Sequence, residues 1–218
     1  MAHSARLLSN ALVRQLLSLR PPEPAAFMTL CNPATHQAKA LSAGFARILH
    51  PLAPRWSGRN RVSASGLSAS WRDWLYDEGS LTARLSALQP GTFNVQVVRQ
   101  YYGQPTAVER QGLALGNNQT VWVREVVLNL GTVPLVYART AVPVCSLTGK
   151  GARLKGLGNR SLGSFLFRQP GLKRTPLAVS HCAPNHLGLQ WSRRSVFSLG
   201  RQSLMVTEAF SAHLNEFV

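Results

Sequence analysis

The sequence predicts an α+β fold built on a single antiparallel sheet. Apolar and polar residues alternate over 121–142 and over 191–211, and each of these stretches is interrupted by a short turn. Phe93, Val95 and Val97 alternate with polar neighbours in the same way. Helical spacing is confined to short stretches outside these segments. Strands that follow one another through turns favour antiparallel pairing, with helices packed on the sheet.

Two short helices are predicted at the start of the folded part. Trp71 and Trp74 lie on one face of the first helix, and Gly79 breaks the pattern. Ser80 is placed to cap the second helix, which begins with Leu81. The folded domain therefore opens with a helix pair, ahead of the strand that begins near Phe93.

Two hairpins follow. In the first, residues 121–130 and 135–142 are strands joined by the turn at 131–134, and Pro143 closes the pair. In the second, strands at 191–199 and 203–211 flank the turn Gly200-Arg201-Gln202.

The stretch between the two hairpins carries helical signals. Residues 146–157 are compatible with a helix that ends at Gly158, and residues 161–167 suit another short helix. We expect both helices to cap the sheet.

The composition favours a folded protein and argues against several function classes. Hydrophobic residues make up 45% of the 218 residues, and the formal net charge is +16. Such a charge favours anionic partners, but the basic residues are dispersed and no nucleic-acid-binding motif accompanies them. No apolar stretch reaches the roughly 20 residues that cross a bilayer. We therefore expect neither nucleic-acid binding nor membrane insertion, and a small anionic ligand fits the charge.

Residues 1–70 are predicted to be a basic, low-complexity extension that is poorly ordered, and residues 71–218 to be the folded domain. The extension holds eight basic residues and one acid, Glu23. Its start resembles an amphipathic targeting peptide. An alternative is a start codon assigned too far upstream, with Met28 as an internal start. We favour the second interpretation and expect no targeting role.

Arg124 is a candidate ligand-binding residue. It shares a strand face with Trp122 and Val126, so a cation projects where apolar side chains project. The guanidinium either reaches the sheet edge or pairs with a protein carboxylate. The other possibility is that it binds the carboxylate of a ligand.

Glu208 is the second candidate, an acidic residue on an apolar strand face. Its strand neighbours Val206 and Phe210 carry it toward the core, where a lone carboxylate is strongly disfavoured. It is expected either to form a buried ion pair with Arg124 or Arg139, or to contact the substrate and handle a proton. Both possibilities place Glu208 in one cavity with Arg124.

Other chemistries find little support. His181, Cys182 and His186 are close in sequence, but Pro184 breaks the segment and no second ligand pair accompanies it, so we expect no metal site. The three cysteines include no CxxC pair, and their scatter is typical of a reducing compartment. No phosphate-binding glycine loop and no GxSxG motif occurs.

Six short blocks, in this order, resemble chorismate lyase. They cover roughly residues 71–214, and the extension before them matches no family that we recognise. The blocks are Trp74-Leu-Tyr-Asp-Glu-Gly-Ser-Leu-Thr-Ala-Arg-Leu85, Val121-Trp-Val-Arg-Glu-Val126, Ala138-Arg-Thr-Ala-Val-Pro-Val144, Leu162-Gly-Ser-Phe-Leu-Phe167, Trp191-Ser-Arg-Arg-Ser195 and Thr207-Glu208.

The resemblance implies a sheet of about six antiparallel strands and an enclosed ligand cavity. It implies that Arg124 holds the ring carboxylate of the substrate and that Glu208 faces the opposite end of the ring, near the 4-hydroxyl. Leu81 and Leu162 are implied to line the cavity, in part through backbone groups. Family members often have methionine at the position of Leu81, which puts a role specific to that side chain in doubt.

The resemblance also implies an activity, the removal of pyruvate from chorismate to give 4-hydroxybenzoate, the first committed step toward the ubiquinone ring. It implies a cytoplasmic monomer that uses no cofactor and no metal. The rival hypothesis is a non-catalytic, effector-sensing domain of the same fold. Such domains usually follow a winged-helix DNA-binding domain, and residues 1–70 lack that pattern.

Overall fold

The computed structural model describes residues 56–58, 67–182 and 188–217, and a seven-stranded antiparallel sheet organises this part of the chain. Its central path has the order β1-β2-β3-β7-β6-β4, and β5 also pairs with β6. The strands are β1 Phe93–Gly103, β2 Val121–Leu130, β3 Val133–Pro143, β4 Leu172–Arg174, β5 Ala178–His181, β6 Leu189–Leu199 and β7 Gln202–Ser211.

The predicted α+β class with an antiparallel sheet is confirmed, and both predicted hairpins are present as β2-β3 and β6-β7. The sheet has seven strands where the resemblance implied about six. Two of them, β4 and β5, have three and four residues, too few for alternation to reveal them in the sequence. Both pair with the same long strand, β6.

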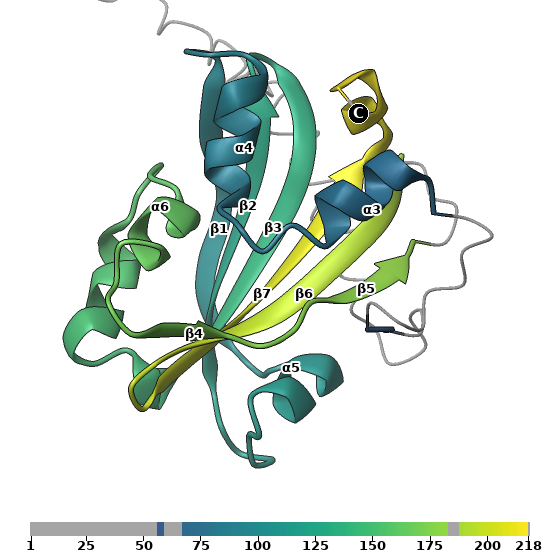
Figure 1. Cartoon of the computed structure of the whole chain (residues 1–218). Helices are drawn as coiled ribbons and strands as arrows, with labels where there is room; N and C mark the ends of the chain where they lie inside the picture. Colours follow the sequence, from purple (N-terminus) through teal and green to yellow (C-terminus); the bar gives the residue numbers. More distant parts are fainter. Residues whose placement is uncertain (1–55, 59–66, 183–187, 218) are drawn as a thin grey trace, which may run out of the picture. The chain divides into compact units, whose positions relative to one another are not determined.

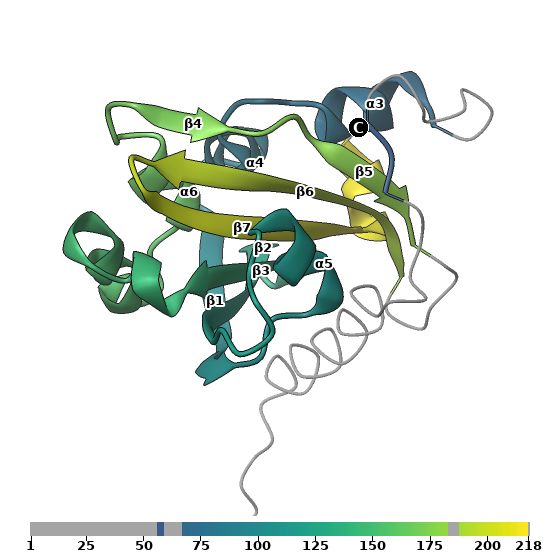
Figure 2. The same ribbon diagram turned by 90° about the horizontal axis from the view of Figure 1, so that it is seen from below.

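Helices cover both faces of the sheet, but unequally (Figure 1). The helices α3, α4 and α6 pack on one face, which we call the cavity face, and α5 packs on the opposite face (Figure 2). Three 3-10 segments complete the described elements. The bounds are α3 Ala69–Leu75, α4 Leu81–Leu88, α5 Ala107–Gly112, α6 Leu162–Leu166, η1 Val144–Ser146, η2 Gly149–Gly156 and η3 Ala212–Phe217.

The helix predictions were right where a cap was visible in the sequence. Ser80 caps α4, and its side chain accepts a hydrogen bond from the backbone N–H of Ala83. The helix expected over residues 146–157 is instead two 3-10 segments. Gly151 explains part of this difference, because a Cβ there would lie 1.9 Å from the Ser146 carbonyl oxygen. Tight 3-10 turns suit such a close backbone approach.

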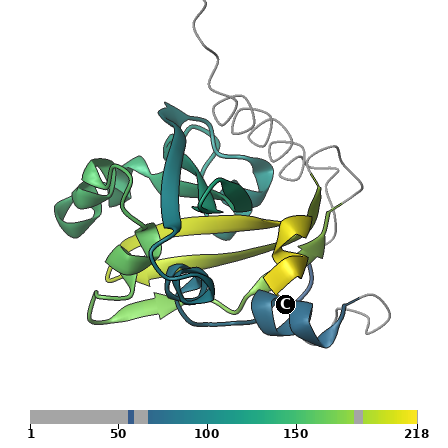
Figure 3. The same cartoon turned by 90° about the horizontal axis from the view of Figure 1, so that it is seen from above.

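The main core lies between the sheet and the helix pair α3 and α4. Trp71 packs edge-to-face against Phe210, with ring centroids 6.2 Å apart. Leu75, Leu85 and Leu214 are almost wholly buried in the same cluster. Leu214 belongs to η3, which lies beside α3 (Figure 3). Burial of these large apolar side chains holds the helices on the cavity face.

The predicted extension, residues 1–70, lies almost wholly outside the described residues, as does its targeting-like start. The boundary at residue 70 therefore stays a prediction. Residues 56–58 are described, and Ser57 exchanges two backbone hydrogen bonds with Val179 of β5, at 2.9 and 2.8 Å. Trp56 lies under the guanidinium of Arg194 on β6. Among the described residues, no helix is long and apolar enough to span a membrane.

Candidate active site

A cavity lies between the cavity face of the sheet and the first turns of α4 and α6. The four site residues predicted from the sequence all line it: Leu81, Arg124, Leu162 and Glu208. The structure thus brings together residues from α4, β2, α6 and β7, although their roles stay predictions. Apolar side chains contribute about half of the remaining lining residues: Val95, Val126, Leu128, Ala138, Leu166, Phe167, Phe197 and Val206.

Arg124 is buried, and no carboxylate of the described residues forms a salt bridge with it. Its side chain is 2% exposed, and Nη2 donates a hydrogen bond to the Arg160 carbonyl oxygen at 3.1 Å. Nη1 has no hydrogen-bond partner among the described residues. Burial lowers the pKa of Arg124, because desolvation disfavours the charged form. Among the described residues, the Arg124 guanidinium neither reaches the surface nor forms an ion pair, and the alternative that it binds an anionic ligand stays a prediction.

Glu208 forms a partly buried ion pair, but not with either of the expected partners. Arg193 Nε donates to Glu208 Oε2 at 2.6 Å. The expected pairing with Arg124 or Arg139 is therefore wrong. Arg193 is 1% exposed, and its Nη1 also donates to the Trp74 carbonyl oxygen, which ties the end of α3 to the sheet.

The sequence contained a signal for this pairing. The turn of the β6-β7 hairpin determines which residues pair across it, and the pair next to the turn is Leu199 with Gln202. Counting outward from that pair places Arg193 opposite Glu208, as observed. Gln202 was predicted to lie in the turn, whereas it belongs to the strand. The predicted pairing was therefore shifted and did not place Arg193 opposite Glu208.

Arg139 lies on the opposite face of the sheet, and alternation explains why. Its neighbours in sequence, Ala138 and Thr140, line the cavity, so the side chain of Arg139 points away from it. There it pairs with Glu109 of α5 at 2.7 Å and with Glu125 of β2 at 2.7 Å. This buried network holds α5 on the sheet.

The helices α4 and α6 close the cavity from above the sheet. Thr82 and Ser161 join them through a hydrogen bond between their hydroxyl groups. Leu81 and Leu162 are the first residues of the two helices, and the first backbone N–H groups of a helix have no partner inside it. The N–H groups of Leu81 and Leu162 therefore have no partner within their own helices. A Cβ at Gly163 would lie 3.1 Å from Thr82 Oγ1, so this glycine permits the close approach.

Arg174 also lines the cavity, and reasoning from the sequence missed it. It ends the short strand β4, and Nε donates to Ser195 Oγ at 2.9 Å. Nη1 donates to the Glu78 carbonyl oxygen at 3.1 Å. No alternation marks a three-residue strand, so nothing in the sequence indicated that this arginine faces the cavity.

Metal ligands are not grouped in the described part of the chain. Among the residues described, no three His, Cys, Asp or Glu side chains lie close enough to hold an ion. His181 packs edge-to-face on Trp191 at 4.7 Å between ring centroids. His186 lies outside the described residues, so the expectation for the segment 181–186 stays a prediction.

Comparison with known proteins identifies relatives of this chain. A family model described as chorismate lyase matches residues 55–215. A probable chorismate pyruvate-lyase of Chromohalobacter salexigens is 42% identical over 154 residues, which are 67% of this chain and 82% of that protein. Proteins of the same description from Pseudomonas aeruginosa and Hydrogenovibrio crunogenus are 38% and 35% identical, over 67% and 72% of this chain and 85% and 90% of theirs.

Solved structures with lower sequence identity include proteins described as possible transcriptional regulators and as effector domains. The possible regulator YydK of Bacillus subtilis is 17% identical, with a TM-score of 0.45 over 60% of this chain and 62% of that one. The effector domain of PhnF from Mycobacterium smegmatis is 16% identical, with a TM-score of 0.44 over 62% of this chain and 90% of that domain.

Proposed function

Because this chain belongs to the chorismate lyase family, we propose that it removes pyruvate from chorismate and releases 4-hydroxybenzoate. The product would enter the ubiquinone ring, and the enzyme would act in the cytoplasm as a monomer without a cofactor, as the resemblance implies. The proposal includes named residues. Arg124 and Glu208 act on the substrate, and Leu81 and Leu162 line its binding site.

The observation that carries this proposal is the unpaired cation in an apolar cavity. Arg124 is 2% exposed, and its Nη1 has no hydrogen-bond partner among the described residues. A buried charge without an ion pair is strongly destabilising unless a ligand compensates it. The ring carboxylate of chorismate supplies that charge, and a planar guanidinium binds a carboxylate with two parallel hydrogen bonds.

The reaction requires little from the protein beyond orientation and the handling of one hydrogen. The bond between ring carbon C3 and the enolpyruvyl oxygen breaks, and C4 loses its hydrogen. The departing enolpyruvyl unit gains a hydrogen on its methylene carbon and becomes pyruvate, so atoms balance without a co-reactant. Aromatisation of the ring provides the driving force. Exclusion of water and fixed charges at both ends of the ring would lower the barrier.

Glu208 is assigned to the hydroxyl end of the ring. Sheet order separates it from Arg124 by β3, so the two side chains lie about two strand spacings apart, roughly 10 Å. The ion pair with Arg193 holds its carboxylate in one orientation. One carboxylate oxygen is thereby engaged, and the other can accept a hydrogen bond from the 4-hydroxyl. We propose that this contact positions C4 for loss of its hydrogen.

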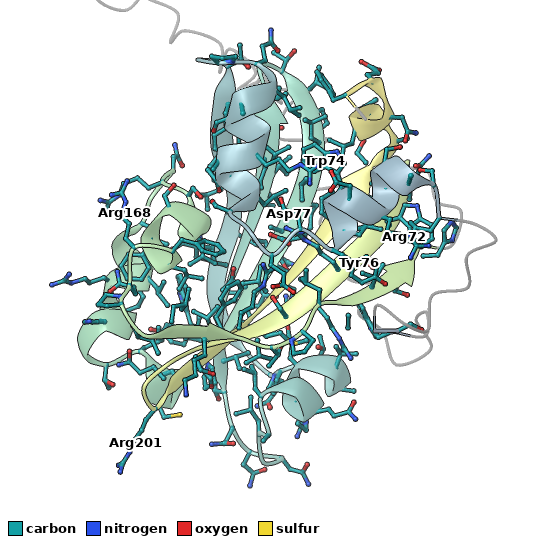
Figure 4. All side chains as sticks on the ribbon, in the orientation of Figure 1. Arg72, Trp74, Tyr76, Asp77, Arg168 and Arg201 are labelled. Carbon is teal, nitrogen blue, oxygen red and sulfur yellow. The ribbon has the colours of Figure 1, made fainter. Side chains whose placement is uncertain are left out.

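The test is incubation of the purified chain with chorismate alone, with 4-hydroxybenzoate and pyruvate both quantified. Equimolar products are expected from the wild type, with Arg124→Ala and Glu208→Ala strongly impaired. Arg124→Lys is expected to remain impaired, because a point charge cannot replace a bidentate fork. Arg168→Ala is the matched control, since this arginine is exposed and points away from the molecule (Figure 4). Tight binding of 4-hydroxybenzoate without turnover would instead favour an effector-sensing module.

A further inference from the structure

Two arginines that line the cavity form no salt bridge with any carboxylate of the described residues. Arg124 is the first, on β2. Arg174 is the second, on β4, and its described hydrogen-bond acceptors are the Ser195 hydroxyl and the Glu78 carbonyl oxygen. In the part of the chain that the structure describes, no salt bridge includes either of these two. The third arginine in the lining, Arg193, is paired with Glu208.

The two unpaired arginines lie on opposite sides of Glu208. Along the sheet, β7 carries Glu208, with β2 two strands away on one side and β4 two strands away on the other. The pairing register places the two arginines two residues apart along β7, which is about 7 Å. Arg124 aligns with Thr140 and so with Val206, and Arg174 aligns with Phe197 and so with Leu204. Long side chains from these two positions face the cavity from opposite edges.

The electrostatic surroundings support this placement. Desolvation lowers the pKa of Arg174, and Glu208 acts in the opposite direction. Glu208 is therefore close enough to raise the pKa of Arg174, as are Asp77 and Glu78, while Arg193 lowers it. For Arg124 the cause is desolvation by burial. Arg174 thus belongs to the Glu208 end of the cavity, where the ring hydroxyl is proposed to bind.

Chorismate carries two carboxylates, one on ring carbon C1 and one on the enolpyruvyl group attached at C3, beside the hydroxyl at C4. With the C1 carboxylate at Arg124 and the hydroxyl near Glu208, the enolpyruvyl carboxylate falls at the Glu208 end. We infer that Arg174 binds the enolpyruvyl carboxylate, which makes it the residue that distinguishes the dicarboxylate substrate from the monocarboxylate product. This inference rests on the proposed function.

The surroundings of Arg174 suit such a role. Ser195 and Glu78 hold Nε and Nη1, and the guanidinium lies over the ring of Phe197 at 4.9 Å. The described hydrogen bonds leave Nη2 for a ligand. Arg174 and Phe167 also line a second hollow, whose rim includes the exposed residues Glu78 and Thr175. Arg174 therefore lies where the cavity and this second hollow meet.

The test uses the full-length protein and measures separately how it binds the ring carboxylate and the enolpyruvyl carboxylate of the substrate. Arg174→Gln, Arg174→Lys and Arg124→Gln are compared with Arg168→Gln, an exposed control. KM and kcat are measured for chorismate, and Kd is measured by calorimetry for 4-hydroxybenzoate, which has only the ring carboxylate. Arg174→Gln is expected to raise KM by roughly tenfold or more while the Kd for 4-hydroxybenzoate stays within about threefold. Arg124→Gln is expected to weaken both.

Two results would overturn the inference. One is an unchanged KM for chorismate in Arg174→Gln. The other is a parallel loss of affinity for both ligands, which indicates a purely structural role. Should Arg174→Gln fold poorly, Arg174→Lys together with rescue of Arg174→Ala by added guanidinium provides the same comparison. Absence of turnover by the wild type contradicts the proposed function instead, and calorimetry with chorismate itself then decides whether Arg174 binds the second carboxylate.

Discussion

Replacing Arg193 with methionine tests the ion pair that orients Glu208. The substitution keeps an unbranched apolar stem and removes three hydrogen bonds. Those bonds go to Glu208 Oε2 at 2.6 Å, to the Trp74 carbonyl oxygen at 2.8 Å and to the Asp77 carbonyl oxygen at 3.0 Å. The first orients the proposed substrate contact, and the other two attach the end of α3 and the segment after it to β6.

The magnitude follows from burial. Removing one partner of a buried ion pair costs about 3–5 kcal/mol, because the other charge stays behind without compensation. Arg193 is 1% exposed, but the side chain of Glu208 is 14% exposed and recovers some hydration. The lower end, about 3 kcal/mol, therefore applies. For a folded domain of this size, the melting midpoint should fall by roughly 6–12 °C.

Urea unfolding of Arg193→Met and of the wild type measures this loss, with Arg168→Met as the exposed control, expected within about 0.5 kcal/mol of the wild type. Adding Glu208→Gln to Arg193→Met should cost less than the sum of the single losses, because the orphaned charge is then gone. A loss below about 1 kcal/mol in Arg193→Met, or strict additivity, would refute the reasoning.

Three further predictions concern other parts of the molecule. Glu109→Gln breaks the buried ion network on the face opposite the cavity, so unfolding studies should show a loss of about 3 kcal/mol, while a changed KM for chorismate would contradict the separation of the two faces. Gly163→Ala crowds the α4–α6 contact and should destabilise the fold by about 1–2 kcal/mol. Gly156→Ala, which has open space around its Cβ, should not. Burial raises the pKa of the Cys182 thiol to about 11, and the thiolate is the reactive species. At pH 8 a thiol reagent should therefore label exposed Cys145 and spare Cys182, with labelling of Cys182 rising only as the pH approaches 11; peptide mapping distinguishes the two.

Much of the cavity face was predictable because a strand alternates with a period of two residues. Once 121–130 and 203–211 are recognised as strands, Arg124 and Glu208 must project with apolar neighbours. The same rule sends Arg139 to the other face, and consistent use of it excludes that residue as a partner of Glu208. Hairpin register likewise makes Arg193 the neighbour of Glu208.

The helix ends were also encoded locally. A serine before an apolar run caps a helix through its own hydroxyl, so Ser80 and Ser161 are informative without any tertiary contact. These short-range rules, together with the two hairpins, are sufficient to predict the fold class. They also place Leu81 and Leu162 at the starts of their helices.

Only the tertiary structure decided which distant segments meet. Arg174 faces the cavity because β4 pairs with β6, and a three-residue strand carries no pattern that announces its partner. The hydroxyl contact between Thr82 and Ser161 joins residues 79 positions apart. Local sequence determines which way a side chain points from its own backbone. Long-range packing decides which residues line a cavity. Burial of apolar surface drives that packing, and it is non-directional, so it does not reveal from the sequence which distant segments meet.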